Sequence, residues 1–538
     1  MRVHALVYLF CSCLIAMLAA GCSSDNDTSL ETISVSTSVK LEAQRLANVL
    51  KAKGYEVTSG HFKLYTKQDC DDYSYKVMGS CYGNNPAAPY ILTVVKSWPK
   101  EYLDPATRYA FGYTDEGESG SFRLDPREAI VIFGQMPPPA AYFGLQTYLF
   151  TREDTFKTDS AAYLYIAANF PAMLNTFFQT VPNNDKRIVL FASLGNSNNN
   201  VVVQNQSGSF FNQKHYFVIT PDRYMDKAVR EALAEISVSG SAVFSEPIPS
   251  TTRIGLGESA DEFMFLMRYA MPQDGGGSGT QSDKWRTNLP LAILRIRDPN
   301  TSRSPEPYGP PALEKRLVND ESWLASDLAK LVAEVSSRWG QPCTTEDCSD
   351  RASDLIDLQG EPISMIGPLC TEIGMNCVGD TQDASYHGTV NLDLDNGEVY
   401  ALAGTLATET GNATYVGLSI NESLRFWGAA NIDSDQLKNT ASAYSSLLYD
   451  STKFYLYYFT RDCSSIKTLA GDNCFSITTD MIEPCTSTDP SECDHLKLAQ
   501  RAYIKNGTQR GPDSTRTMPP YTPPYLLKPK LIKLNVPN

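Results

Sequence analysis

Four short blocks of the chain occur twice in the same order, and this internal duplication limits the possible folds more than any other feature. The first block reads CYGNNPAAPY at 81–90 and CVGDTQDASY at 377–386, with Cys, Gly, Ala and Tyr at matching positions. The other pairs are EAIVIFG (128–134) with EVYALAG (398–404), AAYFGLQTY (140–148) with ATYVGLSIN (413–421), and HYFVITPD (215–222) with FYLYYFTRD (454–462). The fold must therefore hold two related halves.

The repeated blocks are short, apolar, rich in aromatic residues and separated by turn residues, a pattern that predicts strands. We expect an α+β fold that is rich in antiparallel strands, sandwich-like, with flanking helices and two unequal duplicated halves. The expected order is a signal peptide over 1–21, a polar tether over 22–37, a first half with helical insertions over 38–340, a second half over 341–505, and a Pro-rich tail over 506–538 that is extended.

Several segments have the apolar spacing of helices. Residues 38–54 are expected to form a helix after the tether, and residues 322–339 an amphipathic helix. Residues 159–181 are apolar all round, which favours a buried helix over a membrane helix or a partner-docking surface. Ser259 is expected to cap a helix over DEFMFLMRYAM. Thr220 is expected to cap another, with Pro221 as its first residue.

The N-terminus begins with the basic Met1-Arg2 pair, continues with a short apolar run from Leu6, and ends in Leu18-Ala-Ala-Gly-Cys22. This arrangement resembles the signal of bacterial lipoproteins, although Ala19 departs from the commoner Leu. The resemblance implies that Cys22 is lipidated and becomes the mature N-terminus. Ser23 follows, without Asp there, which in that family implies the outer rather than the inner membrane. An ordinary secretory signal cut nearby is the competing interpretation.

Charge narrows the set of partners. The formal net charge is −15 at neutral pH. Nucleic acid and anionic lipid surfaces therefore make poor partners, and contact with the membrane would depend on the lipid anchor.

Cysteine usage indicates an oxidising compartment. Ten cysteines follow Cys22 and fall into five short intervals, for which we predict five local disulfides, although the spacing leaves other pairings open. The predicted pairs are Cys70–Cys81, Cys343–Cys348, Cys370–Cys377, Cys463–Cys474 and Cys485–Cys493. Zinc binding is the rejected alternative, because no C-x-x-C pair occurs and histidines are scarce.

Searches for catalytic motifs find no G-x-S-x-G, G-x-x-x-x-G-K-[ST] or H-E-x-x-H. A candidate site comes instead from the difference between the two copies of the first block. The first copy has Asn84, Ala87 and Ile91 where the second has Asp380, Asp383 and His387. Two carboxylates and an imidazole could bind a divalent metal or another ligand, or perform acid–base chemistry. The structural alternative is that Asn84 and Asp380 form Asx turns while Asp383 and His387 face water.

These observations predict a lipid-anchored envelope protein with a non-enzymatic role in binding or in envelope architecture. Its expected partners are the membrane, through the lipid on Cys22, and an envelope protein or glycan. The alternative is a periplasmic or surface hydrolase, or a metal-dependent enzyme, with its site around Asp380, Asp383 and His387.

Overall fold

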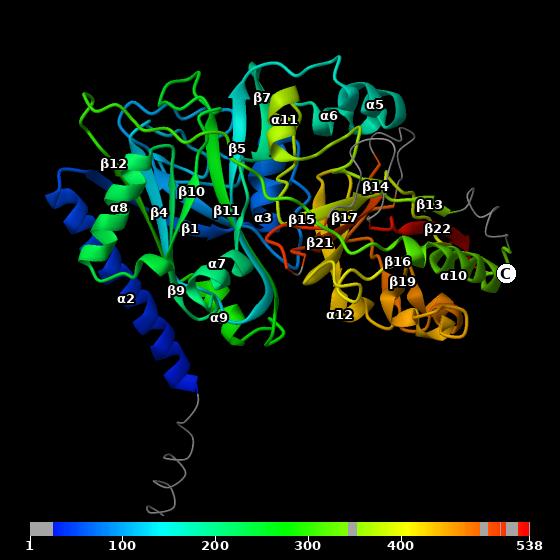
Figure 1. Cartoon of the computed structure of the whole chain (residues 1–538). Coiled ribbons are helices and arrows are strands. Elements are labelled where there is room, and N and C mark those ends of the chain that lie inside the picture. The colour runs from blue at the N-terminus through cyan, green and yellow to red at the C-terminus, as the bar shows by residue number, and fades with distance from the viewer. Residues whose placement is uncertain (1–24, 343–351, 485–492, 506, 513–525, 537–538) are drawn as a thin grey trace, which may run out of the picture.

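A computed structural model describes residues 25–342, 352–484, 493–505, 507–512 and 526–536, with side chains from residue 36 onward. Most of the first half of the chain lies on the left in Figure 1 and most of the second half on the right, while residues 161–177 of the first half reach over to the upper right. Strands of the first half form one long sheet, and strands of the second half form two shorter sheets.

The sheet of the first half is mostly antiparallel and follows one path of ten strands, with two short strands beside it. In spatial order the path is β10 (Val243–Pro247), β9 (Lys214–Thr220), β4 (Glu128–Gln135), β12 (Leu291–Arg297), β1 (Glu56–Leu64), β2 (Ile91–Lys96), β11 (Glu262–Pro272), β5 (Ala140–Glu153), β7 (Asn184–Ser193) and β6 (Thr180–Val181). The short strand β3 (Glu118–Ser119) pairs with β2, and β8 (Asn198–Asn199) pairs with β5.

The second half repeats this order in two sheets. One contains β20 (Cys474–Ser476), β19 (Phe454–Thr460), β16 (Glu398–Thr405), β22 (Lys530–Asn535) and β13 (Ala352–Asp354). The other contains β14 (Ile356–Asp357), β15 (Ala384–Gly388), β21 (Leu496–Tyr503), β17 (Tyr415–Glu422) and β18 (Trp427–Asp433).

Strand pairing follows the sequence repeats residue by residue. Ile130 of β4 lies opposite Ile219 of β9, and the corresponding residues Tyr400 and Phe459 pair in the same way. The last strand of each row, β10 or β20, is parallel to its neighbour in both halves. Duplicated sequence has therefore produced duplicated topology.

One long strand explains why the first half has a single sheet. The first part of β1 pairs with β12, and the part from Gly60 onward pairs with β2. A Cβ at Gly60 would lie 2.2 Å from the Val94 carbonyl oxygen, so only glycine allows this close crossing. In the second half Leu355 separates β13 from β14, so the row divides into two sheets.

Helices flank the sheets (Figure 1). They are α2 (Asp25–Ala52), α3 (Lys67–Asp69), α4 (Tyr75–Met78), α5 (Ala161–Asn169), α6 (Leu174–Phe177), α7 (Asn200–Ser207), α8 (Arg223–Glu235), α9 (Gln281–Asn288), α10 (Ala325–Arg338), α11 (Gly367–Ile373), α12 (Ser434–Leu437) and α13 (Lys467–Ala470). The described residues include no helix with the length and apolar character needed to cross a membrane.

Two long helices occupy equivalent positions. Leu46 and Leu50 of α2 pack with α8 against β4, β9 and β12, whereas Leu331 and Val335 of α10 pack against β16, β19 and β22. The amphipathic helix predicted over 322–339 is present, but it covers the sheet of the second half. The predicted boundary at 340 therefore assigns this helix to the wrong half.

The ends of the chain also differ from the prediction. The helix predicted from residue 38 begins earlier, at Asp25, so most of the expected tether over 22–37 is helical. In the predicted Pro-rich tail over 506–538, β22 lies between β13 and β16 inside a sheet. The second half therefore extends beyond the predicted boundary at 505, because its sheet needs this strand. The tail between 513 and 525 and the signal peptide lie outside the described residues.

Two predicted helices are different elements. The segment after Ser259 is the strand β11, buried for most of its length between β2 and β5. The apolar run over 159–181 divides into α5, a 3₁₀ turn that begins at Pro171, α6 and β6. Proline has no N–H to donate and cannot continue the first helix. The helix after β9 is present, but its cap is Asp222 rather than Thr220, and it begins at Arg223.

Three predicted disulfides are present: Cys70–Cys81, Cys370–Cys377 and Cys463–Cys474. The pair Cys343–Cys348, and Cys485 of the fifth pair, lie outside the described residues. The first two disulfides occupy equivalent positions in the two copies, at the start of the repeated first block.

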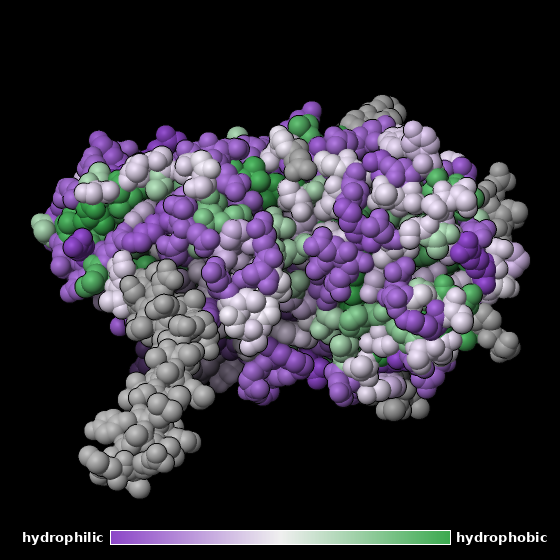
Figure 2. Space-filling view, turned by 90° about the horizontal axis from the view of Figure 1, so that it is seen from below, coloured by the Kyte–Doolittle hydropathy of each residue, from purple (hydrophilic) through white to green (hydrophobic). Residues whose placement is uncertain are grey.

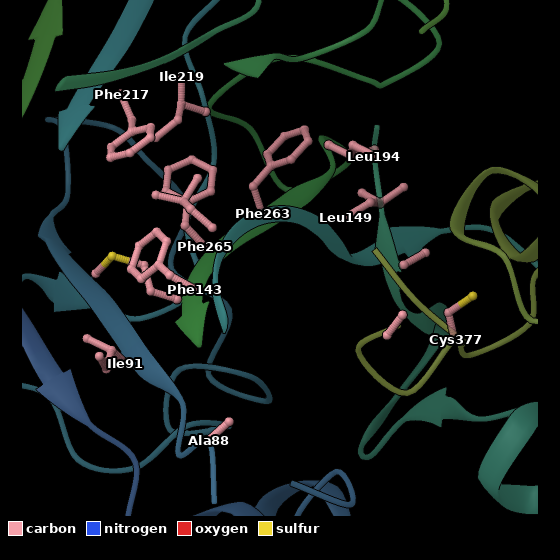
Figure 3. Packing of buried hydrophobic residues seen from close by; sticks show 14 of the residues in the cluster. Ala88, Ile91, Phe143, Leu149, Leu194, Phe217, Ile219, Phe263, Phe265 and Cys377 are labelled. Atoms are coloured by element: carbon pink, nitrogen blue, oxygen red, sulfur yellow. The ribbon is translucent and has the colours of Figure 1, made fainter. Parts of the chain in front are cut away.

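The largest hydrophobic core contains residues of both halves. Leu149 and Leu194 of the first half belong to the same buried cluster as Cys377, Tyr415 and Tyr503 of the second. Figure 3 shows Cys377 on the ribbon of the second half near Leu149 and Leu194. On the face shown in Figure 2, hydrophilic and intermediate residues predominate, and hydrophobic residues form scattered patches. The two halves are thus joined by shared apolar burial.

Candidate functional site

The two copies of the first block dock reciprocally, each onto the other half. Backbone N–H groups of Cys81 and Gly83 donate to carbonyls of the β17–β18 turn, the bond from Gly83 to Phe426 being 2.7 Å long. Likewise Gly379 N donates to the carbonyl oxygen of Phe191 in β7 at 2.9 Å. We name residues 81–90 and 377–386 the docking loops.

Glycine is required at the tip of each docking loop. Gly83 has φ +56° and Gly379 has φ +68°, both in the left-handed region. A Cβ at Gly83 would lie 2.5 Å from the Phe426 ring, and a Cβ at Gly379 would lie 2.8 Å from the Phe191 ring. Both copies of the first block therefore have glycine at this position because an aromatic ring lies too close for a Cβ.

A buried arginine of each half holds the docking loop of the other half. Arg268 of β11 donates from Nη2 to the Gly379 carbonyl at 2.8 Å, and Arg501 of β21 donates from Nη2 to the Gly83 carbonyl at 2.6 Å. The two arginines occupy equivalent positions in their sheets: Arg268 pairs with Gly144 of β5, and Arg501 pairs with Gly417 of β17. Charge-assisted hydrogen bonds of this kind are strong when they are buried.

Asp380, the first residue of the predicted site, belongs to this interface. Its carboxylate accepts hydrogen bonds from Ser193 N (2.8 Å), Ser193 Oγ (2.7 Å) and Gly367 N (3.0 Å). Burial raises the pKa of Asp380, and the bonds from Ser193 oppose that rise. In the other loop Asn84 Oδ1 accepts from Gly428 N at 2.9 Å. The predicted Asx turns are wrong, because both side chains bind the opposite half.

Asp383 is fully buried and also has several donors. Its oxygens accept from the Tyr142 hydroxyl (3.1 Å), from Thr381 Oγ1 (2.8 Å) and from Asn199 Nδ2 (3.2 Å). Tyr142 belongs to the first half, so this carboxylate too connects the halves. The alternative in which Asp383 faces water is wrong.

His387 lies apart from the two carboxylates. It sits in β15, is 2% exposed, and has an Nε2 without a hydrogen-bond partner. Burial lowers its pKa to about 4, and the charge of Lys528 adds to the effect. Among the residues described, no hydrogen bond or ion pair links His387 to Asp380 or Asp383, and no three His, Cys, Asp or Glu side chains are grouped to hold a metal. The alternative in which His387 faces water is also wrong, because its side chain is buried.

A more distinctive carboxyl lies in a cavity of the first half that no sequence motif predicted. The cavity has a volume of about 430 Å³ and is lined by the end of β10, residues 194–198, residues 308–312 and Gln509 of the second half. Glu246 lines it and is 5% exposed. Its carboxyl accepts from Thr147 N (2.6 Å) and Asn198 Nδ2 (3.2 Å). Within the described part of the chain no basic side chain pairs with it.

Because Glu246 is buried without a basic partner among the described residues, its carboxyl has an altered pKa. Burial raises its pKa to about 7, and the bonds from Thr147 and Asn198 offset only part of the cost of charge. The hydroxyl of Ser197, which also lines the cavity, is buried without a hydrogen-bond partner among the described residues. A buried hydroxyl of this kind can bond a water or a ligand.

Comparison with known proteins gives little further guidance. No family model matches the chain, and no curated protein matches it. One solved structure, an uncharacterized protein from Burkholderia cenocepacia, is 8% identical and aligns over 92% of this chain and 87% of that chain, with a TM-score of 0.36. A likeness of this size supports no inference about function.

Proposed function

We propose that the chain is a lipid-anchored binding protein of the bacterial outer membrane, without catalytic activity. The observation that carries the anchor is the LAAGC sequence ending at Cys22, followed by Ser23. The helix α2 begins at Asp25 and extends away from the body at its N-terminal end (Figure 1), while its C-terminal part packs on the first-half sheet. A lipid on Cys22 would thus be joined by a helix to the folded body.

The non-enzymatic part of the proposal is supported by how the candidate residues are used. Catalytic carboxylates need a free oxygen toward the substrate. Asp380 and Asp383 instead receive hydrogen bonds from both halves. Asn84 makes the equivalent contact in the other docking loop without a charge. An amide that replaces a carboxylate at the matched position favours a structural role over acid–base chemistry.

The anchor is tested by metabolic labelling with a fatty acid in a Gram-negative host, followed by separation of the membranes. The chain should take up the label and sediment with the outer membrane, and Cys22→Ser should abolish the label. Cys13→Ser, a change within the apolar run, is the matched control and should keep it. Ser23→Asp should redirect the labelled protein to the inner membrane. Unlabelled wild-type protein, or label retained in Cys22→Ser, would contradict the proposal.

A further inference from the structure

The cavity beside Glu246 has chemistry that the duplicated half lacks. Register pairing places Glu246 of β10 opposite Ile219, and the equivalent residue of β20 is Phe475, opposite Phe459. Thr147 of β5 corresponds in the repeat to Ile420 of β17. The second half therefore builds the same position from apolar residues that belong to one hydrophobic cluster. The fold does not need a carboxyl here.

Glu246 has no charged partner, and the Ser197 hydroxyl has no hydrogen-bond partner among the described residues. In two other cavities a carboxylate pairs with a lysine: Glu42 with Lys214 beside α2, at 2.5 Å, and Glu409 with Lys438 where the halves meet, at 3.0 Å. Glu246 has only neutral donors, from Thr147 and Asn198. A buried carboxyl that the fold does not need and does not pair is costly, and a ligand that donates hydrogen bonds would offset that cost.

Arg223, on another wall of the cavity, limits the charge that a ligand can carry. Arg223 also lines it, stacked over the Tyr308 ring with 5.2 Å between its Cζ and the ring centroid. A cation would be repelled by Arg223 and an anion by Glu246, so a neutral ligand fits best. Four prolines complete the wall with apolar surface: Pro247, Pro249, Pro310 and Pro311.

We infer that this cavity binds a neutral saccharide of one or two sugar units, whose hydroxyls donate to Glu246 and bond with Ser197 Oγ. Sugar hydroxyls both donate and accept, as the Ser197 hydroxyl does. The apolar face of a sugar ring suits the proline wall, and 430 Å³ lies within the usual size of small-molecule sites. The inference rests on the proposed binding role but not on the lipid anchor.

The test is saturation-transfer NMR on the full chain in mild detergent, with millimolar glucose, galactose, N-acetylglucosamine and their disaccharides, and with free amino acids as zwitterionic competitors. At least one sugar should receive saturation. Glu246→Gln and Ser197→Ala should each weaken its binding about tenfold or more, since each removes a group that bonds the ligand. Glu422→Gln, a change at a buried carboxyl of the second half, should leave binding unchanged.

Ser197→Ala separates a ligand role from a structural one. The Ser197 hydroxyl has no hydrogen-bond partner among the described residues, so its removal should leave the melting temperature of the free chain unchanged while the affinity falls. Saturation of no sugar, saturation of amino acids alone, or sugar binding unaffected by Glu246→Gln would each overturn the inference. Loss of fatty-acid labelling with sugar binding intact would count against the anchor alone.

Discussion

At the scale of single residues, Asn84 and Asp380 show that a difference between two copies need not mark a function. Both side chains accept a backbone N–H of the opposite half, at 2.9 Å and 2.8 Å. A neutral amide and a carboxyl meet the same geometric need. The comparison of the copies drew attention to Asp380 and Asp383, which are buried and bond residues of the first half, but their acidity is not what these contacts require. Their partners lie in the other half, which no local pattern reveals.

Glu246 was missed because it lies outside the four repeated blocks. Its strand β10 is short, and nothing in VFSEP distinguishes a buried carboxyl from an exposed one. Only the pairing of β10 with β9 puts Glu246 at the position that Phe475 occupies in the second half. The difference between Glu246 and Phe475 can therefore be found by comparing the two halves, but only after the strand registers are known.

His387 should make the chain less stable as the pH falls below neutrality. Its pKa is about 4 in the folded chain, against about 6.5 when unfolded, so between these values the unfolded chain binds the extra proton. The stabilisation is complete above pH 6.5 and falls by about 3 kcal/mol as the pH reaches 4. His387→Gln should remove this part of the pH dependence, measured by urea unfolding from pH 7.5 to 4.

The control is Ser385→Ala, because Ser385 is a buried residue of the same strand and carries no titratable group. Its unfolding free energy should follow the wild-type pH dependence. An equally steep fall in His387→Gln and in the wild type would show that other groups cause the acid sensitivity.

At the scale of elements, the strands of the repeated blocks were predictable and β11 was not. The blocks carry turn residues at their ends, so EAIVIFG and HYFVIT read as strands and are strands. The segment EFMFLMRYAM is buried on both faces, and this removes the alternation that identifies a half-exposed strand. Ser259 then looks like a helix cap. Burial on both faces is a property of the assembled sheet, not of the segment.

Substitution of the docking-loop glycines should test how tightly these loops fit. Gly379→Ala forces a Cβ to within 2.8 Å of the Phe191 ring at φ +68°, and should destabilise the chain by about 2–4 kcal/mol. Gly79 has the same φ of +68° with nothing within 4 Å of its Cβ. Gly79→Ala should therefore cost only about 1 kcal/mol. Chemical denaturation measures both.

Equal losses in the two variants would mean that backbone strain alone is responsible and that the Phe191 ring moves aside. A larger loss in Gly379→Ala assigns the excess to the ring contact. Gly83→Ala should behave like Gly379→Ala, because Phe426 closes its site in the same way.

At the scale of the whole molecule, the duplication was visible in the sequence, but the exchange of docking loops was not. Repeated blocks show which segments correspond; they do not show whether a segment packs on its own half or on the other. Arg268 and Arg501 decide this, since each bonds the loop of the opposite half. The outcome resembles the isologous contact of a dimer of identical subunits, in which the same patch serves both partners, here built within one chain.

Because each docking loop packs on the opposite half, we expect the two halves to unfold together. One buried cluster contains residues of both, and Arg501 bonds Gly83 across the interface while also contacting Ser419. Arg501→Met leaves the Gly83 carbonyl without this donor and should cost about 2–4 kcal/mol. Hydrogen exchange followed by mass spectrometry should show the same loss of protection in β4 of the first half and β16 of the second.

The surface variant Lys533→Ala, which removes an ion pair with Glu398 on the second half, should change protection in neither strand measurably. Protection lost from β16 alone in Arg501→Met would show that the halves open independently, and calorimetry would then resolve two transitions. A single transition that moves as a whole to lower temperature is expected instead, because separating the halves would expose the core they share.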